Sequence, residues 1–138
     1  MERNKIYAVI DTNVLVSALL PHQGVTNPSV VLGAIMNERI IPVFNSEILG
    51  EYLEVLTREK FHFQRTSVET VVNHIKQIGL ELDRTRSWEG VFPDPKDVVF
   101  YEVTLSKDDA YLVTGNIKHF PKKPFVVTPA EMVEILGL

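Results

Sequence analysis

Short apolar runs alternate with amphipathic segments along the chain, and this alternation predicts the elements of the fold. The first run, Ile6–Ile10, is continuous and partly β-branched, which is typical of a strand that is covered on both faces in a parallel sheet. Further strands are predicted at 40–44, 80–82, 110–114 and 125–127. Pro42 lies within the second strand and favours a position at the sheet edge, because proline cannot donate a ladder hydrogen bond.

Periodic apolar positions and capping signals predict helices between these strands. Asn27 followed by Pro28 is typical of a helix start. The segments 66–69 and 128–131 have the spacing of capping boxes, in which two side chains accept from each other's backbone amides. We therefore predict helices over 14–20, 27–37, 47–57, 66–78, 94–106 and 130–136. Strands that alternate with helices indicate an α/β fold with a small parallel sheet between helices.

Length and composition narrow the class of protein. The chain has 138 residues, of which 45% are hydrophobic and 23% charged, and this predicts one globular domain over residues 1–138. The absence of cysteine from the sequence excludes disulfide frameworks, thiolate zinc sites and cysteine nucleophiles. A net charge of −4 argues against a protein that binds nucleic acid mainly by bulk charge.

The apolar runs are too short for membrane insertion. The run at Ile6–Ile10 stops at Asp11 and does not reach the length of a signal sequence core. Elsewhere no stretch approaches the roughly 20 apolar residues of a membrane span. We therefore expect a cytoplasmic protein without a membrane partner.

Polar residues end two of the predicted parallel strands. Asp11 follows the first strand and Asn13 lies two residues further on, while Thr114 and Asn116 end the strand at 110–114. Ligands of open parallel sheets bind outside the carboxyl ends of the strands, so these residues are candidates for one site. Asp and Asn also commonly cap helices or form turns. The apolar flanks of Asp11 nevertheless predict partial burial, and a buried carboxylate needs a partner.

Helical geometry separates the acids of the predicted helix at 47–57. At about 100° per residue, Glu47 and Glu54 point away from the apolar face, which predicts that both are solvated. Glu51 lies at the border of that face, where it either reaches a cleft beside the core or forms an exposed ion pair. Asp97, near the start of the predicted helix at 94–106, either adds a carboxylate beside the strand ends or only complements the helix dipole.

Four segments in chain order resemble the PIN-domain nucleases, and within them the branch described as toxin components of toxin–antitoxin systems. They are 9–20, which contains Val-Ile-Asp-Thr-Asn, 45–56, 94–100 and 111–116, and the segment 127–131 resembles the usual family ending. The resemblance implies a PIN-like α/β/α sandwich with a small central parallel sheet. It also implies a Mg²⁺- or Mn²⁺-dependent ribonuclease that hydrolyses RNA phosphodiester bonds, forms a homodimer and has an antitoxin protein as its partner.

The same resemblance implies which residues form the site. Asp11, Glu51 and Asp97 match the acids that bind Mg²⁺ or Mn²⁺, and Asn13 and Thr114 match polar neighbours that orient ligands or water. Oxygen ligands suit Mg²⁺, which is a hard cation and keeps several waters. Three acids brought together without a cation would repel one another and raise at least one pKa.

The sequence departs from the family pattern at two positions. Many relatives have Asp where this chain has Asn116, and many have a further Asp where it has His119. Asn116 is expected to ligate through its carbonyl oxygen or to act through water, and His119 is expected to be solvated. These departures favour one metal over two.

They also keep open a catalytically weakened PIN fold that binds RNA or a protein without cleavage. A third alternative, a nucleotide-binding α/β protein of another class, lacks support because the sequence contains no Gly-rich phosphate loop.

The location of charge is more informative than its sum. The three candidate acids carry most of the net negative charge, and a bound cation would offset them further. Two groups of basic residues, which we expect to flank the cleft, are Arg58, Lys60 and Arg65, and Lys118, Lys122 and Lys123.

Overall fold

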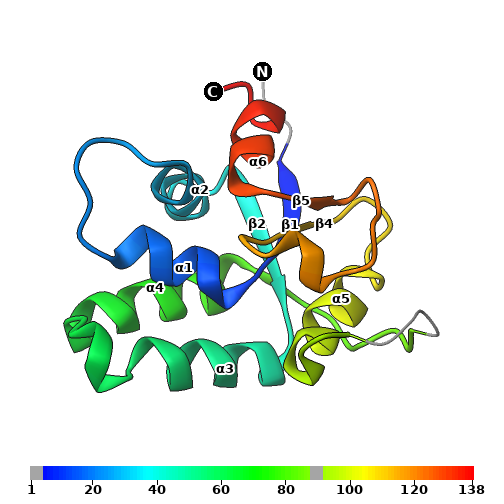
Figure 1. Ribbon diagram of the computed structural model, residues 1–138, viewed down its shortest axis with the longest axis horizontal. Helices are drawn as coiled ribbons and strands as arrows, with labels where there is room; N and C mark the ends of the chain where they lie inside the picture. The colour runs from blue at the N-terminus through cyan, green and yellow to red at the C-terminus, as the bar shows by residue number, and fades with distance from the viewer. Residues whose placement is uncertain (1–4, 88–91) are drawn as a thin grey trace.

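A five-stranded parallel sheet with the order β3–β2–β1–β4–β5 forms the centre of the computed structural model, which describes residues 5–87 and 92–138 (Figure 1). All four strand pairings are parallel. The strands are β1 (Ile6–Ile10), β2 (Ile40–Phe44), β3 (Leu80–Glu81), β4 (Tyr111–Val113) and β5 (Val126–Val127). Each of the five predicted strands is confirmed, with ends that shift by two residues or fewer.

Helices cover both faces of this sheet. The α-helices are α1 (Thr12–Leu19), α2 (Asn27–Met36), α3 (Ser46–Leu56), α4 (Arg65–Ile78), α5 (Val98–Thr104) and α6 (Pro129–Ile135). Short 3-10 turns are η1 (Glu59–Phe61), η2 (Pro95–Asp97) and η3 (Ile117–His119). Figure 1 shows α2 and α5 on opposite sides of the strands, which confirms the predicted α/β/α sandwich. Within the described ranges, no helix is both long and apolar enough to span a membrane.

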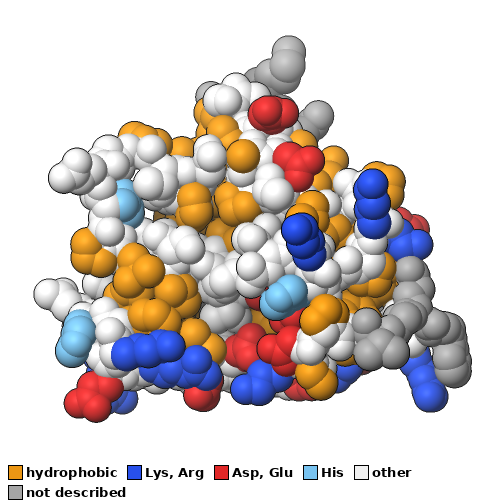
Figure 2. Space-filling model, viewed as in Figure 1, with side chains coloured by type: hydrophobic (Ala, Val, Ile, Leu, Met, Phe, Trp, Pro, Cys, Tyr) orange, Lys and Arg blue, Asp and Glu red, His pale blue; other side chains and the backbone are white. Residues whose placement is uncertain are grey.

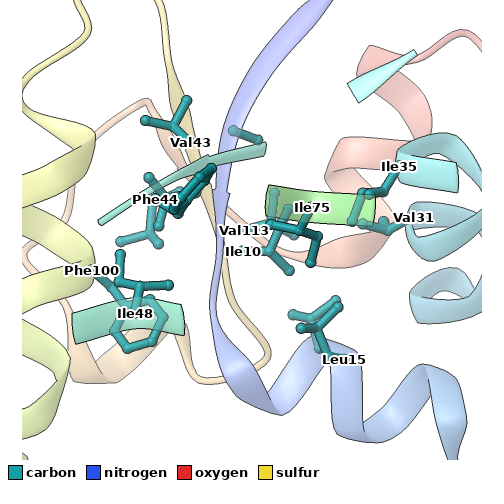
Figure 3. Packing of buried hydrophobic residues seen from close by; sticks show 14 of the residues in the cluster. Ile10, Leu15, Val31, Ile35, Val43, Phe44, Ile48, Ile75, Phe100 and Val113 are labelled. Atoms are coloured by element: carbon teal, nitrogen blue, oxygen red, sulfur yellow. The ribbon is translucent and has the colours of Figure 1, made fainter. Parts of the chain in front are cut away.

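The hydrophobic core lies on both sides of the central strand β1. Figure 3 shows Ile48 and Phe100 on one side of β1 and Val31 and Ile35 on the other. All four side chains are fully buried. Burial on both faces explains why the sequence of β1 is a continuous apolar run and does not alternate.

The prediction that Pro42 marks a sheet edge is wrong, because β2 lies between β1 and β3. The short strand β3 pairs only with Val43 and Phe44. The ladder on that side therefore begins after Pro42, and the missing amide costs no hydrogen bond to β3.

The structure contains one of the two predicted capping boxes. At the start of α6, the amide of Glu131 donates to Thr128 Oγ1 (3.1 Å) and the amide of Thr128 donates to Glu131 Oε1 (2.9 Å). The box predicted at 66–69 is wrong, because α4 begins at Arg65 and the carboxylate of Glu69 forms an ion pair with Arg65 (3.1 Å).

Two other helix starts differ from the prediction. The N-cap of α2 is Thr26, one residue before Asn27, and it forms a capping box with Ser29. The helix predicted over 94–106 is divided into η2 and α5, which meet at Asp97. A carboxylate oxygen of Asp94 accepts from the amide of Lys96 and so starts η2.

Gly79 allows α4 and β2 to approach closely. A Cβ atom at this position would lie 2.6 Å from the carbonyl oxygen of Pro42 and 2.8 Å from the ring of Phe44. Both distances are far below van der Waals contact, and one of the neighbours is backbone. Glycine is therefore required here by space and not by backbone conformation.

Substitution of this glycine tests the close approach. We expect Gly79→Ala to lower the free energy of unfolding by about 1–3 kcal/mol, because the added methyl group must displace backbone. The matched control is Gly50→Ala in α3, where a Cβ meets nothing within 4 Å, and this change should raise stability by up to about 1 kcal/mol. Urea denaturation measures both values. Equal stability of Gly79→Ala and the wild type would contradict the packing described.

Candidate functional site

Three acidic side chains from separate elements approach one another at the carboxyl end of the central strands. Asp11 follows β1, Glu51 lies in α3 and Asp97 ends η2. Figure 1 shows α3 crossing beyond the ends of the strands, and α3 packs against α1, α4 and α5 there. The charges of Glu51 and Asp97 both act on the pKa of Asp11, so the structure brings the three predicted acids into one electrostatic cluster.

Hydrogen bonds hold the buried carboxylate of Asp11, whose exposed fraction is 5%. Thr114 Oγ1 donates to Asp11 Oδ2 (2.8 Å), and Asn13 Nδ2 donates to the same oxygen (3.1 Å). The Asn13 amide oxygen accepts in turn from the backbone amide of Gly115 (3.0 Å). These bonds connect the end of β1 to the end of β4, as expected for polar residues that follow two neighbouring parallel strands.

Burial raises the pKa of Asp11 to about 6. Desolvation is the largest cause, because it disfavours the charged form. The hydrogen bond from Thr114 acts in the opposite direction, while the charges of Asp97 and Glu51 raise the pKa further. The expected repulsion among the acids is therefore present, although burial has the larger effect.

Glu51 is held by the first residue of α1. Thr12 Oγ1 donates to Glu51 Oε2 (3.0 Å), and Glu51 is half-buried. Among the described residues Glu51 forms no ion pair, so the alternative of an exposed ion pair is not found. The solvated positions predicted for Glu47 and Glu54 are confirmed, since both are exposed and form ion pairs with arginines.

The neighbouring residue, Tyr52, anchors α3 to β1. Its side chain is fully buried, and its hydroxyl donates to the carbonyl oxygen of Ile10 (2.5 Å). Ile10 directly precedes Asp11, and Tyr52 directly follows Glu51. The core thus fixes the separation between Asp11 and Glu51.

Asp97 contacts His119, which the sequence predicted to be solvated. His119 Nδ1 lies 3.2 Å from Asp97 Oδ2, and the Asp97 side chain is 13% exposed. Burial raises the pKa of Asp97, the hydrogen bond and charge of His119 lower it, and Asp94 and Glu51 raise it. The His119 side chain is 42% exposed, so it is in contact with solvent as predicted. The contact with Asp97 was not predicted, because it depends on how η3 turns the ring toward η2.

Asn116 lies beside the cluster but is exposed. Its backbone amide donates to Thr114 Oγ1 (2.9 Å). Its side chain makes no hydrogen bond to the residues that the structure describes. The structure therefore gives Asn116 a backbone contact to the residue that holds Asp11, and leaves its amide group in solvent.

The donor set suits a divalent cation that keeps much of its water. In residues 5–87 and 92–138, no group of three or more His, Asp and Glu side chains is arranged to hold a metal ion as it stands. Mg²⁺ is commonly bound through one or two carboxylates with waters in its remaining positions. The charges of Asp97 and Glu51 repel that of Asp11, and a nearby cation would offset this repulsion.

Acidic side chains gather on one face, near the lower centre of the view in Figure 2, with a histidine beside them. Lysine and arginine side chains lie on the same face, over the carboxyl end of α3 and over the connection between β4 and β5. Basic side chains therefore share a face with acidic side chains, and the flanking of the cleft by the two basic groups stays a prediction.

A comparison with protein families matches residues 7–118 to the PIN domain. The chain belongs to the PIN domain family. PIN domains are generally nucleases, which implies binding of nucleic acid, and they typically use divalent metal ions. The matched residues include the three acids and Asn116, whereas His119 directly follows them. Curated proteins and solved structures provide no match to the chain.

The raised pKa of Asp11 contributes a stabilisation of this PIN domain that is lost as the pH rises. The pKa of Asp11 is about 6 in the folded protein against 3.8 for an ordinary Asp, so the folded state binds this proton more tightly. The stabilisation is complete below pH 3.8 and is lost as the pH rises through 6. Between about pH 4.5 and pH 7.5, titration of Asp11 should lower the free energy of unfolding of the wild type by roughly 2 kcal/mol. The variant Asp11→Asn should not show this decrease.

Urea denaturation in EDTA at the two pH values measures this difference for the PIN domain. Asp108→Asn is the matched control, since Asp108 is exposed and its substitution should leave the pH dependence as in the wild type. A wild-type pH dependence in Asp11→Asn would show that Asp11 is not the group that titrates.

Proposed function

We propose that this PIN domain is a Mg²⁺- or Mn²⁺-dependent endoribonuclease and the toxin component of a toxin–antitoxin pair. One observation carries the activity: three carboxylates from β1, α3 and η2 approach one another, and each is oriented by a neighbouring donor. Thr114, Thr12 and His119 contact Asp11, Glu51 and Asp97 respectively.

The proposed metal ligands are Asp11, Glu51 and Asp97. Their hydrogen bonds from the described side chains all end on one oxygen of each carboxylate, Oδ2 or Oε2. The second oxygen of Glu51 and of Asp97 accepts no side-chain bond and is the proposed ligand atom. Asp11 also accepts a backbone hydrogen bond from Thr12 and is proposed to bind through its carboxylate as a whole. A bound divalent cation would polarise the phosphodiester and stabilise the leaving oxygen.

Protein groups around the acids have supporting roles in this proposal. Asn13 and Thr114 hold the Asp11 carboxylate in one orientation, so that little reorganisation is needed when a ligand binds. His119 holds Asp97 in the same way. Asn116 reaches the site through its exposed amide or through water.

A catalytically weakened RNA- or protein-binding module is the second candidate. The observation that favours it is the replacement of two acids of the family pattern by Asn116 and His119. Fewer negative ligands would weaken metal binding and favour one cation over two. Metal uptake and cleavage distinguish the candidates in the experiments below.

The RNA substrate, the homodimer and the antitoxin partner are supported by the resemblance of the four motifs. The toxin assignment is testable in cells. Expression of the wild type should arrest growth and expression of Asp11→Asn should not. Coexpression of the protein encoded by the neighbouring reading frame should restore growth if that protein is the antitoxin.

Removal of any proposed ligand should abolish cleavage. We expect Asp11→Asn, Glu51→Gln and Asp97→Asn each to lower the rate of Mn²⁺-dependent cleavage of RNA by at least about 100-fold, since each removes charge that holds the cation. Glu54→Gln, on the exposed face of the same helix, should cleave like the wild type. Gel analysis of labelled RNA gives the rates, and EDTA should stop the reaction. Equal cleavage by the wild type and Asp11→Asn would identify a contaminating nuclease.

Metal uptake separates the nuclease from the binding module. Calorimetric titration of the wild type with Mn²⁺ should give saturable binding with proton release near pH 6, because Asp11 is partly protonated there and a ligand must be ionised. Asp11→Asn should take up little metal and release no proton. A wild type without saturable uptake would favour the binding module.

A further inference from the structure

Directly beyond the acidic cluster, the chain forms a pocket that the proposed chemistry does not use. The pocket has a volume of about 240 Å³ and is lined by Ile117, Lys118, Phe120, Lys122, Lys123 and Val126. It lies between η3 and β5. Drug-sized ligands usually occupy roughly 300–1,000 Å³, so this volume suits a single planar ring system such as one nucleobase.

The pocket has an apolar interior with a cationic rim. Phe120 and Val126 are buried, whereas Ile117 is 40% exposed at the edge. The ring of Phe120 is fixed by an edge contact with Phe92, with a centroid distance of 6.2 Å. Lys118 and Lys122 are exposed, and neither forms an ion pair with the part of the chain that the structure describes.

The pocket is continuous with the candidate site along the chain. Thr114, which holds Asp11, is three residues before Ile117. His119, which contacts Asp97, lies between the pocket residues Lys118 and Phe120. A polynucleotide whose phosphate lies at the carboxylates would therefore have a neighbouring nucleotide within reach of the pocket.

We propose that this pocket binds one unstacked base of a single-stranded RNA, and that Lys118 and Lys122 contact the phosphates on either side of it. The pairing of apolar walls with cations matches a nucleotide, which has a flat apolar ring next to negative charge. Single-stranded binding proteins combine stacking surfaces with positive charge in this way. The proposal rests on the proposed function and adds to it a specific contact site for one base, the pocket between η3 and β5.

Binding measured without cleavage tests the pocket separately from the activity. Fluorescence anisotropy in EDTA would follow a labelled single-stranded oligoribonucleotide of about ten nucleotides, beside a duplex of the same sequence. We expect Ile117→Ala to weaken single-strand binding roughly five-fold, because apolar contact with the base is lost. The slope of log affinity against log salt should stay unchanged in this variant, and duplex binding should stay unchanged as well.

The lysines should show the opposite pattern. The double variant Lys118→Ala/Lys122→Ala should reduce the salt slope by about 1.4, since each phosphate contact on a single strand contributes about 0.7. Ile135→Ala is the matched apolar control, because Ile135 is 37% exposed in α6. Lys76→Ala in α4 is the charge control, and both controls should bind like the wild type.

The outcomes separate failure of the pocket from failure of the proposed function. In one outcome, both pocket variants bind RNA with the affinity and salt dependence of the wild type while cleavage still depends on Asp11. This result would overturn the proposed pocket and would not affect the proposed nuclease activity. Binding that depends on Ile117 and the lysines without any cleavage would support the pocket and overturn the nuclease. Equal effects of Ile117→Ala on single-stranded and duplex RNA would also overturn the proposed base contact.

Discussion

The burial of one carboxylate, that of Asp11, is the constraint on which the rest of the site depends. The parallel pairing of β1 with β4 places it there, since the amide of Asp11 donates to the carbonyl oxygen of Val113 (2.9 Å) in continuation of the ladder. A charge held in this position must be compensated. Thr114 and Asn13 compensate it in part, and the nearby charges of two further acids oppose that compensation. The balance of these interactions leaves the pKa of Asp11 raised to about 6.

Much of the fold could be predicted from the sequence because it is encoded in local pattern. The continuous apolar run of β1 and the capping box at 128–131 are visible in a few neighbouring residues and are confirmed. Asp11 and Thr114 could be placed together as well, because the ends of parallel strands meet at one edge of a sheet. The family assignment follows from motifs of the same kind.

The remaining features depend on contacts between elements that the sequence does not encode locally. The position of β2 within the sheet depends on the short strand β3, which pairs with β2 only at Val43 and Phe44, after Pro42. The orientation of His119 depends on how η3 meets η2. For Glu51, helical periodicity leaves two environments open, and only the packing of α3 against α1 selects the bond to Thr12. The single domain, the metal ligands and the homodimer stay predictions.

The buried hydroxyl of Tyr52 has a consequence for how such a protein changes through evolution. Because Tyr52 bonds to the carbonyl of Ile10, the spacing of the first two acids is part of the packed interior and is complete before any ligand arrives. Substitutions on the surface can therefore alter what the protein recognises without moving these acids. Substitutions that remove the Tyr52 hydroxyl or change the packing around it would alter the separation of these acids. Selection on activity would then act on interior residues that never contact a substrate.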